Sequence, residues 1–170
     1  LGAGDYLKDR HNARIVAVEA LEVPTMLYNG FGDHNIQGIG DKHVPLIHNV
    51  TNTDLIVGVS DKATDRLDVA FNSAAGLRAL ERQGVNSDLT SMLTNLGYSA
   101  ICNALAAIKA AKHWGLGPDD VIVTVATDGA ELYNSEREKV IRRDYPNGFN
   151  DAEGEEVVAK YLFDTTTDHV

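Results

Sequence analysis

The sequence contains a single cysteine, so its fold cannot depend on an internal disulfide. Cys102 falls among apolar residues at helical spacing, where a free cysteine usually behaves as a small core hydrophobe. Aromatic residues make up 6% of the chain and are too scattered to form a base-stacking platform. With 170 residues and 44% hydrophobic content, the chain can still bury a sizeable core, and one compact domain is expected.

Long apolar runs are also missing. No stretch approaches the roughly 20 residues needed to cross a bilayer, and no positively charged segment followed by an apolar one opens the chain. The formal net charge of -10 argues against nucleic acid or an anionic membrane as a partner, because phosphates favour clusters of Lys and Arg. We therefore expect a soluble, cytoplasmic protein.

Metal and hydrolase sites lack the patterns that they need. His34, His43 and His48 are close in sequence, but their intervals do not match a helical His pair, and no Cys or carboxylate pattern completes a zinc set. Ser60 and Ser99 have no nearby base in the sequence that would activate them. We predict neither a metal site nor a serine-hydrolase site.

Short apolar strands alternate with amphipathic helices, which is typical of an α/β fold with a mostly parallel sheet and helices on both faces. The expected strands cover residues 14–20, 55–59 and 121–125, and the expected helices cover 2–10, 41–49, 61–77, 88–94, 99–114 and a last segment from about 134. Ser60 or Asp61, Asn86 or Ser87, and Gly115 are candidate helix caps.

The apolar run at 121–125 is followed by Thr127, Asp128 and Gly129, which places short polar side chains at the carboxyl end of a strand. Open α/β sheets bind ligands at this end. Adjacent residues of an extended segment point to opposite sides, so Thr127 and Asp128 are alternatives rather than a pair. A turn, or a cap for the helix that follows, is the other interpretation.

A glycine-rich segment covers residues 33–40, with the sequence Asp-His-Asn-Ile-Gln-Gly-Ile-Gly. Gly38 and Gly40 allow the backbone to approach a flat ligand without a Cβ clash. Together with Gln37 they form a candidate binding loop. A plain glycine-rich turn is the alternative.

Both segments resemble the cysteine synthase (O-acetylserine sulfhydrylase) family of fold-type-II pyridoxal-phosphate enzymes. Residues 33–40 are similar to the family's His-Lys-Ile-Gln-Gly-Ile-Gly segment, and residues 121–133 to its last core strand. A strand at 16–19, a strand end at 59–61 and a glycine-serine run at 96–99 follow the family's order. The resemblance extends from the beginning of the chain to Tyr133.

Three features depart from the family. Asn35 stands where many relatives have Lys, Tyr98-Ser99-Ala100 replaces a Ser-Ser-Gly type of run, and the acidic residues after Arg143 match no part of the family. We therefore divide the chain into residues 1–143, which resemble the C-terminal, cofactor-domain portion of such an enzyme, and an acidic C-terminal extension, residues 144–170.

The resemblance implies pyridoxal 5'-phosphate as the cofactor, and β-elimination or β-replacement on a small amino acid such as O-acetylserine. It implies that the Thr127 hydroxyl meets the pyridine nitrogen, with Asp128 as the alternative cofactor-binding residue. A neutral hydroxyl at that nitrogen leaves it largely unprotonated, which favours β-elimination over transamination. The resemblance also places Gln37, Gly38 and Gly40 on the substrate side of the cofactor.

Several parts of such an enzyme are not in this sequence. In the family, the lysine that binds the cofactor, an asparagine loop for the substrate carboxylate and a Gly-Thr-Gly-Gly-Thr phosphate loop precede the region present here. None of the seven lysines of this chain lies in a similar setting. We therefore expect no catalytic residue in the chain. We expect its partner to be a missing N-terminal part of the enzyme, in the same or a separate polypeptide. The resemblance also implies a homodimer.

Two other functions remain open. The chain could be a truncated, non-catalytic α/β binding module that keeps the sheet for protein interaction. It could also belong to a different α/β small-molecule enzyme that shares only the layered pattern.

Overall fold

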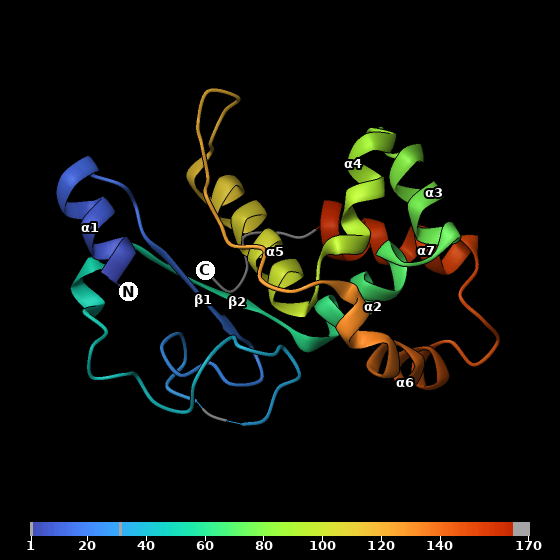
Figure 1. Ribbon diagram of the computed structural model, residues 1–170, viewed down its shortest axis with the longest axis horizontal. Coiled ribbons are helices and arrows are strands. Elements are labelled where there is room, and N and C mark those ends of the chain that lie inside the picture. Colours follow the sequence, from blue (N-terminus) through green and yellow to red (C-terminus); the bar gives the residue numbers. More distant parts are fainter. Residues whose placement is uncertain (1, 31, 165–170) are drawn as a thin grey trace.

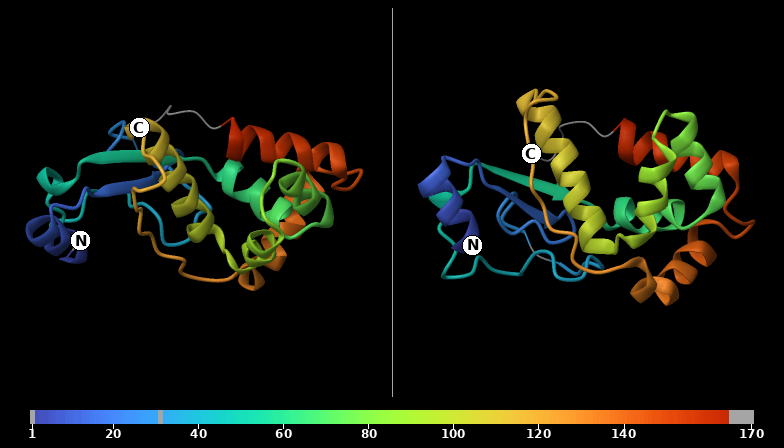
Figure 2. Two further views of the ribbon diagram at one scale, coloured as in Figure 1. Left: turned by 90° about the horizontal axis from the view of Figure 1, so that it is seen from above. Right: turned by 45° about the horizontal axis from the view of Figure 1, so that its top comes forward.

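The structure is a computed structural model that describes residues 2–30 and 32–164. Figures 1 and 2 show a small sheet beside a group of helices. The sheet consists of β1 (Val16–Ala20) and β2 (Leu55–Val59), which pair in parallel along their whole length. The α/β fold with a parallel sheet that the sequence predicted is therefore confirmed, and two strands form this sheet in the described ranges.

Seven α-helices and four shorter helical turns complete the described part of the chain. The α-helices are α1 (Gly2–His11), α2 (Asp61–Phe71), α3 (Ala74–Arg82), α4 (Ser87–Met92), α5 (Tyr98–Trp114), α6 (Asn134–Asp144) and α7 (Asp151–Val158). The turns are η1 (Val50–Asn52), η2 (Leu93–Asn95), η3 (Ala130–Tyr133) and η4 (Ala159–Phe163), of which η4 is a π-helix. No helix in the described ranges has the length and apolar character needed to span a membrane.

The predicted helix caps are confirmed. Ser60 precedes α2, and its hydroxyl accepts a hydrogen bond from the backbone N–H of Ala63 at 3.3 Å. Asn86 precedes α4 and accepts from the N–H of Asp88 at 2.7 Å. Gly115 ends α5 with φ at +60°, a left-handed conformation that glycine adopts without strain. These caps use residues close in sequence, so the local pattern was sufficient to predict them.

Two predicted helices differ from the structure. The helix expected over 61–77 is divided into α2 and α3, because the hydroxyl of Ser73 accepts the backbone N–H of Gly76 at 3.1 Å and so begins a new helix. The helix expected over 41–49 is wrong, since that segment is irregular. Pro45, in its middle, supplies no N–H for a helical hydrogen bond.

The third predicted strand, at 121–125, is wrong for the described part of the chain. Its backbone pairs with no strand there. Val121 and Val123 expose 83% and 87% of their surface. A β-strand needs the N–H and C=O groups of a neighbouring strand, and the described residues offer none at this position. The apolar pattern indicated a strand-forming sequence but could not show whether a neighbour is present.

The hydrophobic core lies between the sheet and the helices. Val57 and Val59 enter it from β2, and α5, which contacts both strands, contributes the fully buried Tyr98. Val157 and Val158 of α7 belong to the same cluster, and α7 packs along α3. Residues on the C-terminal side of the proposed boundary at 143 thus pack on the same core. The division of the chain at this boundary stays a prediction.

Two ion pairs attach α6 to α2. Arg137 of α6 donates from Nε and Nη2 to the two carboxylate oxygens of Asp68 at 2.8 and 2.9 Å, and the Asp68 side chain is fully buried. Arg143 of α6 donates to Asp65 at 3.1 Å. These contacts fix α6, and with it the turn η3 that precedes it, against the core.

Candidate functional site

The segment that carries the predicted cofactor residues is held against α5. After α5 ends, the chain turns and passes back along this helix, as the course of the orange ribbon beside α5 in Figure 1 shows. The side-chain amide of Asn103 donates to the carbonyl of Val125 at 2.9 Å, and the backbone N–H of Gly97 donates to the carbonyl of Asp128 at 2.9 Å. The first half of α5 therefore positions residues 125–128.

Four polar side chains gather at the end of this segment: Ser99, Thr127, Asp128 and Tyr133, here called the Asp128 cluster. The Thr127 hydroxyl donates to Asp128 Oδ1 at 2.9 Å and also hydrogen-bonds the Ser99 hydroxyl. Ser99 donates to the same carboxylate oxygen at 3.3 Å, and the Tyr133 hydroxyl donates to the other, Oδ2. One carboxylate thus organises three hydroxyl groups.

The expectation that Thr127 and Asp128 point to opposite sides is therefore wrong. Their side chains meet because the backbone bends at Asp128 rather than continuing as an extended strand. The alternation rule applies only to regular extended backbone. The side chains of the two residues thus belong to one hydrogen-bonded cluster, and their role in cofactor binding stays a prediction.

Ionisation of Asp128 depends on these partners. Partial burial favours the neutral acid, but hydrogen bonds from Tyr133, Thr127 and Ser99 outweigh it and lower the pKa of Asp128 below its ordinary value. Burial, followed by the hydrogen bond to Asp128, raises the pKa of the Tyr133 phenol. At neutral pH the cluster is therefore a carboxylate surrounded by protonated hydroxyls.

The sequence did not predict that Gly97 packs closely against the Asp128 cluster. A Cβ at this position would lie 2.7 Å from Asp128 Oδ1 and 2.8 Å from Tyr133 Cε2, closer than real Cβ contacts. Beside it, the rings of Tyr98 and Tyr133 stack with centroids 4.4 Å apart. Only glycine lets α5 begin this close to the cluster. The feature of the sequence that could have indicated this close approach is a glycine just before a helix.

The predicted substrate segment is anchored through its middle. Ile36 is fully buried in the core. The backbone N–H of Asn35 donates to Asp61 at 2.8 Å, and its side-chain amide donates to Asp65 at 3.1 Å. Burial raises the pKa of Asp61, although the hydrogen bond from Asn35 opposes that increase. Asn35, which departs from the family's Lys, thus connects this segment to the start of α2.

The predicted substrate residues themselves are available to a ligand. Gln37, Gly38 and Gly40 are all exposed. Gly38 and Gly40 have φ values of +78° and +77°, in the left-handed region that favours glycine. Gly40 also lines a pocket of about 390 Å³ together with His34 and other residues of the segment. The structure brings Thr127 and Asp128 together, whereas Gln37, Gly38 and Gly40 occupy a separate loop.

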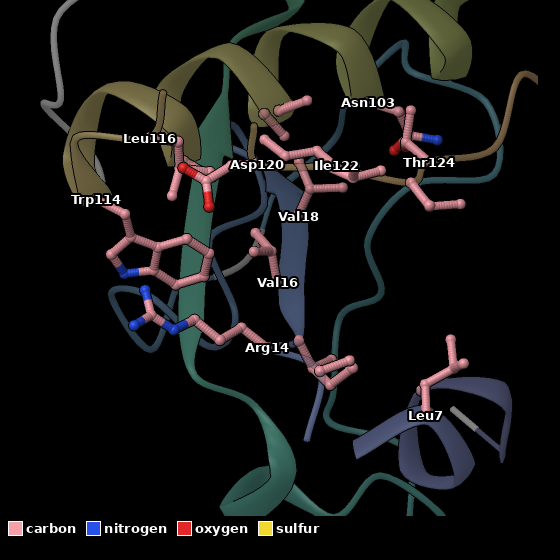
Figure 3. Close-up of a pocket in the computed structure, with 18 of the residues that line it drawn as sticks. Leu7, Arg14, Val16, Val18, Asn103, Trp114, Leu116, Asp120, Ile122 and Thr124 are labelled. Carbon is pink, nitrogen blue, oxygen red and sulfur yellow. The ribbon is translucent and has the colours of Figure 1, made fainter. Parts of the chain in front are cut away.

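A larger cavity of about 890 Å³ opens between α1, β1, α5 and residues 120–124 (Figure 3). Its lining is mostly apolar, with Val16 and Val18 of β1 and Ile122 of the returning segment among the residues that face it. The sequence did not predict this cavity, because it depends on how four segments that are distant in the chain pack together. In the described ranges, no group of His, Cys, Asp and Glu side chains is arranged to hold a metal ion.

Comparison with protein-family profiles gives no match. Among characterised proteins, the chain is 33% identical over 135 residues to cysteine synthase B of Campylobacter jejuni subsp. jejuni, which covers 79% of this chain and 38% of that enzyme. The chain thus corresponds to about two fifths of this relative's length.

Solved structures of longer proteins also superpose on this chain over a part of their own length. O-acetylserine sulfhydrylase isoform 3 from Entamoeba histolytica superposes with a TM-score of 0.63 and 24% identity, over 95% of this chain and 41% of that one. A hydrogen sulfide-producing enzyme from Fusobacterium nucleatum superposes with a TM-score of 0.57 and 26% identity, over 79% of this chain and 35% of that one.

Proposed function

Because the chain is similar in sequence and fold to a part of the cysteine synthase enzymes, we propose that it is the C-terminal portion of a pyridoxal-phosphate-dependent enzyme of that type. The complete enzyme would carry out β-elimination or β-replacement on a small amino acid. The observation that carries the proposal is the Asp128 cluster, which lies at the end of the segment whose sequence resembles the family's last core strand.

The cluster fits the ring nitrogen of pyridoxal phosphate. When bound, this cofactor withdraws electrons from the carbon next to the substrate's amino group. Thr127 is exposed, so its hydroxyl can reach a ligand. Ser99 can donate its proton to Thr127, which frees the Thr127 proton for an acceptor such as an unprotonated pyridine nitrogen. Asp128 keeps its hydrogen bond from Tyr133 in that arrangement and holds the cluster in place.

The loop with Gln37, Gly38 and Gly40 would contact the amino-acid substrate. Its support is the combination of exposed glycines with a buried anchor at Ile36. A loop fixed at its middle but free at its glycines can move over a ligand without unfolding the core. We propose that this loop excludes water from the substrate and orients the substrate next to the cofactor.

The rest of the enzyme would supply the lysine, the phosphate loop and the carboxylate-binding loop that the resemblance implies. This part is the partner that we propose for the chain, in the same or a separate polypeptide. A homodimeric assembly and a cytoplasmic location are further proposals that follow from the resemblance.

The test uses the complete protein that contains this chain. Its intact mass and any copurifying polypeptide should first be determined, and the preparation should then be assayed for conversion of O-acetylserine and sulfide to cysteine. Thr127→Ala should change the cofactor absorbance and lower kcat/KM by about 10-fold or more, as expected for loss of one hydrogen bond of about 1.4 kcal/mol or more. Thr127→Ser should keep both close to those of the unmodified protein.

Thr51→Ala is the control, because Thr51 is exposed, its hydroxyl bonds Asn49, and it lies outside both the Asp128 cluster and the cavity of about 890 Å³. It should change neither the absorbance nor the kinetics. Absence of O-acetylserine conversion by a cofactor-loaded complete protein, or equal behaviour of Thr127→Ala and Thr51→Ala, would contradict the proposed function.

A further inference from the structure

Side-chain contacts connect the predicted substrate segment, residues 33–40, to the end of α6. The side-chain amide of Gln37 lies within 3.4 Å of the carbonyl of Asn35, to which it donates. The Asn35 side-chain amide donates in turn to Oδ1 of Asp65 on α2 at 3.1 Å. The other oxygen of this carboxylate, Oδ2, accepts from Arg143 in the last turn of α6 at 3.1 Å, where α6 lies beside α2 (Figure 1). A buried carboxylate therefore links the substrate segment to a helix far along the chain.

Asp65 lies where a negative charge is costly without a positive partner. Its side chain is 5% exposed. Asp61, one helical turn earlier, accepts the backbone N–H of Asn35 at 2.8 Å. Two carboxylates of α2 therefore face Asn35, which is neutral and offers hydrogen bonds without charge. A buried carboxylate needs both a cation and hydrogen bonds to compensate for the loss of water, and Arg143 supplies the cation.

Arg143 reaches Asp65 from a defined position, although 58% of its side chain is exposed. Its Nε and Nη2 donate to the two carboxylate oxygens of Asp144 at 2.7 and 3.1 Å. The Asp144 side chain is 13% exposed and also accepts from Arg66 of α2 at 3.2 Å. A bidentate pair restricts the orientation of the guanidinium. Because Asp144 is itself held by α2, the guanidinium stays next to Asp65.

We propose that Asn35, Asp65 and Arg143 are positioning residues for the substrate segment, in which Arg143 holds the Asp65 carboxylate in the orientation that fixes the Asn35 side chain. This inference rests on the proposed function and extends it to residues that need not touch the substrate. Gln37, two residues after Asn35, is the residue for which we propose substrate contact. The last turn of α6 thereby determines where the substrate segment lies.

A role in overall stability alone is the alternative. Ile36 is fully buried between Asn35 and Gln37, so the core by itself could hold the segment. The two roles differ in a measurable way. If Arg143 acts on the segment through Asp65 and Asn35, its removal has little further effect once the Asn35 amide is gone. A loss of overall stability would instead be the same in both backgrounds.

Hydrogen exchange in the complete protein that contains this chain tests this difference and needs no cofactor or substrate. The backbone amides of Asn35 and Ile39 report on the segment, since they donate to Asp61 at 2.8 Å and to the Ile36 carbonyl at 3.3 Å. Asn35→Ala and Arg143→Ala should each speed exchange of these amides by about 10-fold, because the segment opens more often. The double variant should exchange no more than about 2-fold faster than Asn35→Ala.

Two outcomes of this cycle would overturn the proposal. Effects that add in the double variant would assign Arg143 to overall stability. Exchange of Arg143→Ala at the rate of the unmodified protein would show that α6 does not hold the segment.

Two further variants make the test specific. Arg143→Lys keeps a positive charge beside Asp65 and should exchange more slowly than Arg143→Ala. Equal exchange of these two variants would refute the role of the charge. Arg142→Ala is the matched control, because Arg142 is the neighbouring residue on α6 and pairs with the exposed Glu138 at 3.6 Å. It should leave the exchange unchanged, and an effect equal to that of Arg143→Ala would refute the assignment to Arg143.

Kinetics of the complete enzyme extend the test to the substrate. Arg143→Ala should raise KM for the amino-acid substrate by about 5-fold and keep kcat within about 2-fold, because a displaced segment weakens binding of substrate and transition state by the same factor. The cofactor absorbance should not change. A lower kcat at unchanged KM would contradict a role in substrate positioning.

The exchange results separate this inference from the proposed function. Faster exchange of Arg143→Ala in a complete protein that does not convert O-acetylserine would refute only the enzymatic function. Unchanged exchange in a protein that converts O-acetylserine would refute only the positioning role of Arg143.

Discussion

Replacing Arg137 by alanine should destabilise the protein by about 3 to 5 kcal/mol, because a buried carboxylate would lose its counter-ion. Arg137 forms a bidentate pair with the fully buried Asp68 at 2.8 and 2.9 Å and also donates to the carbonyl of Ala130 at 3.1 Å. After the replacement, Asp68 keeps the side-chain amide of Asn72 at 3.1 Å. One neutral donor cannot replace a guanidinium at a fully buried carboxylate.

The loss should depend on pH in a specific direction. Burial raises the pKa of Asp68 above its ordinary value of 3.8, and the hydrogen bonds from Arg137 oppose that increase, so the pKa rises further in Arg137→Ala. A carboxyl group with a raised folded-state pKa contributes stability that is complete below 3.8 and is lost as the pH rises through the folded value. The deficit of Arg137→Ala should therefore be largest at neutral pH and should shrink as the pH falls.

Urea unfolding followed by circular dichroism measures both effects, at about pH 7 and at about pH 4.5. Arg142→Ala is the matched control on the same helix, since Arg142 and Glu138 are 69% and 70% exposed and 3.6 Å apart. Its effect should stay below about 0.5 kcal/mol. Equal losses in the two variants, or a deficit of Arg137→Ala that does not change with pH, would refute the electrostatic reasoning.

Two further predictions concern packing. Gly154→Ala should lower the free energy of unfolding by about 1 to 3 kcal/mol, because a Cβ would lie 2.9 Å from the Ala75 carbonyl oxygen where α7 packs on α3. Ala152→Ser, at an exposed position of the same helix, is the control. Equal midpoints of thermal unfolding for the two variants would contradict this prediction. Cys102 is fully buried, and burial raises the pKa of its thiol to about 12, so Ellman's reagent should label it only after denaturation. Rapid labelling of the native protein at neutral pH would show that its site opens.

Features that depend on near neighbours in the sequence were predictable. The caps at Ser60, Asn86 and Gly115 follow from side-chain and backbone preferences within a few residues. The division between α2 and α3 also had a local signal in Ser73, but the apolar stripe that continues through both helices hid it. A helical period shows which face is buried and does not show that the helix is unbroken.

Features that depend on distant residues were not predictable. The sequence predicted Thr127 and Asp128 as cofactor-binding residues, but their joint arrangement with Ser99 and Tyr133 arises from a backbone bend and from the way in which the segment returns along α5. The closeness of Gly97 to Asp128 likewise exists only after that return. Sequence therefore identified the chemical groups, and tertiary packing determined how they combine.

The segment 121–128 has two parts that differ in their surroundings. Its first part exposes apolar side chains and unpaired backbone, while its end holds Thr127 and Asp128 against α5. The side-chain amide of Asn103 at the Val125 carbonyl and the N–H of Gly97 at the Asp128 carbonyl hold the backbone on both sides of Thr127. Binding geometry accurate to fractions of an ångström requires such support from regular structure. The beginning of α5 therefore positions the Thr127 hydroxyl for the role in cofactor binding that we propose.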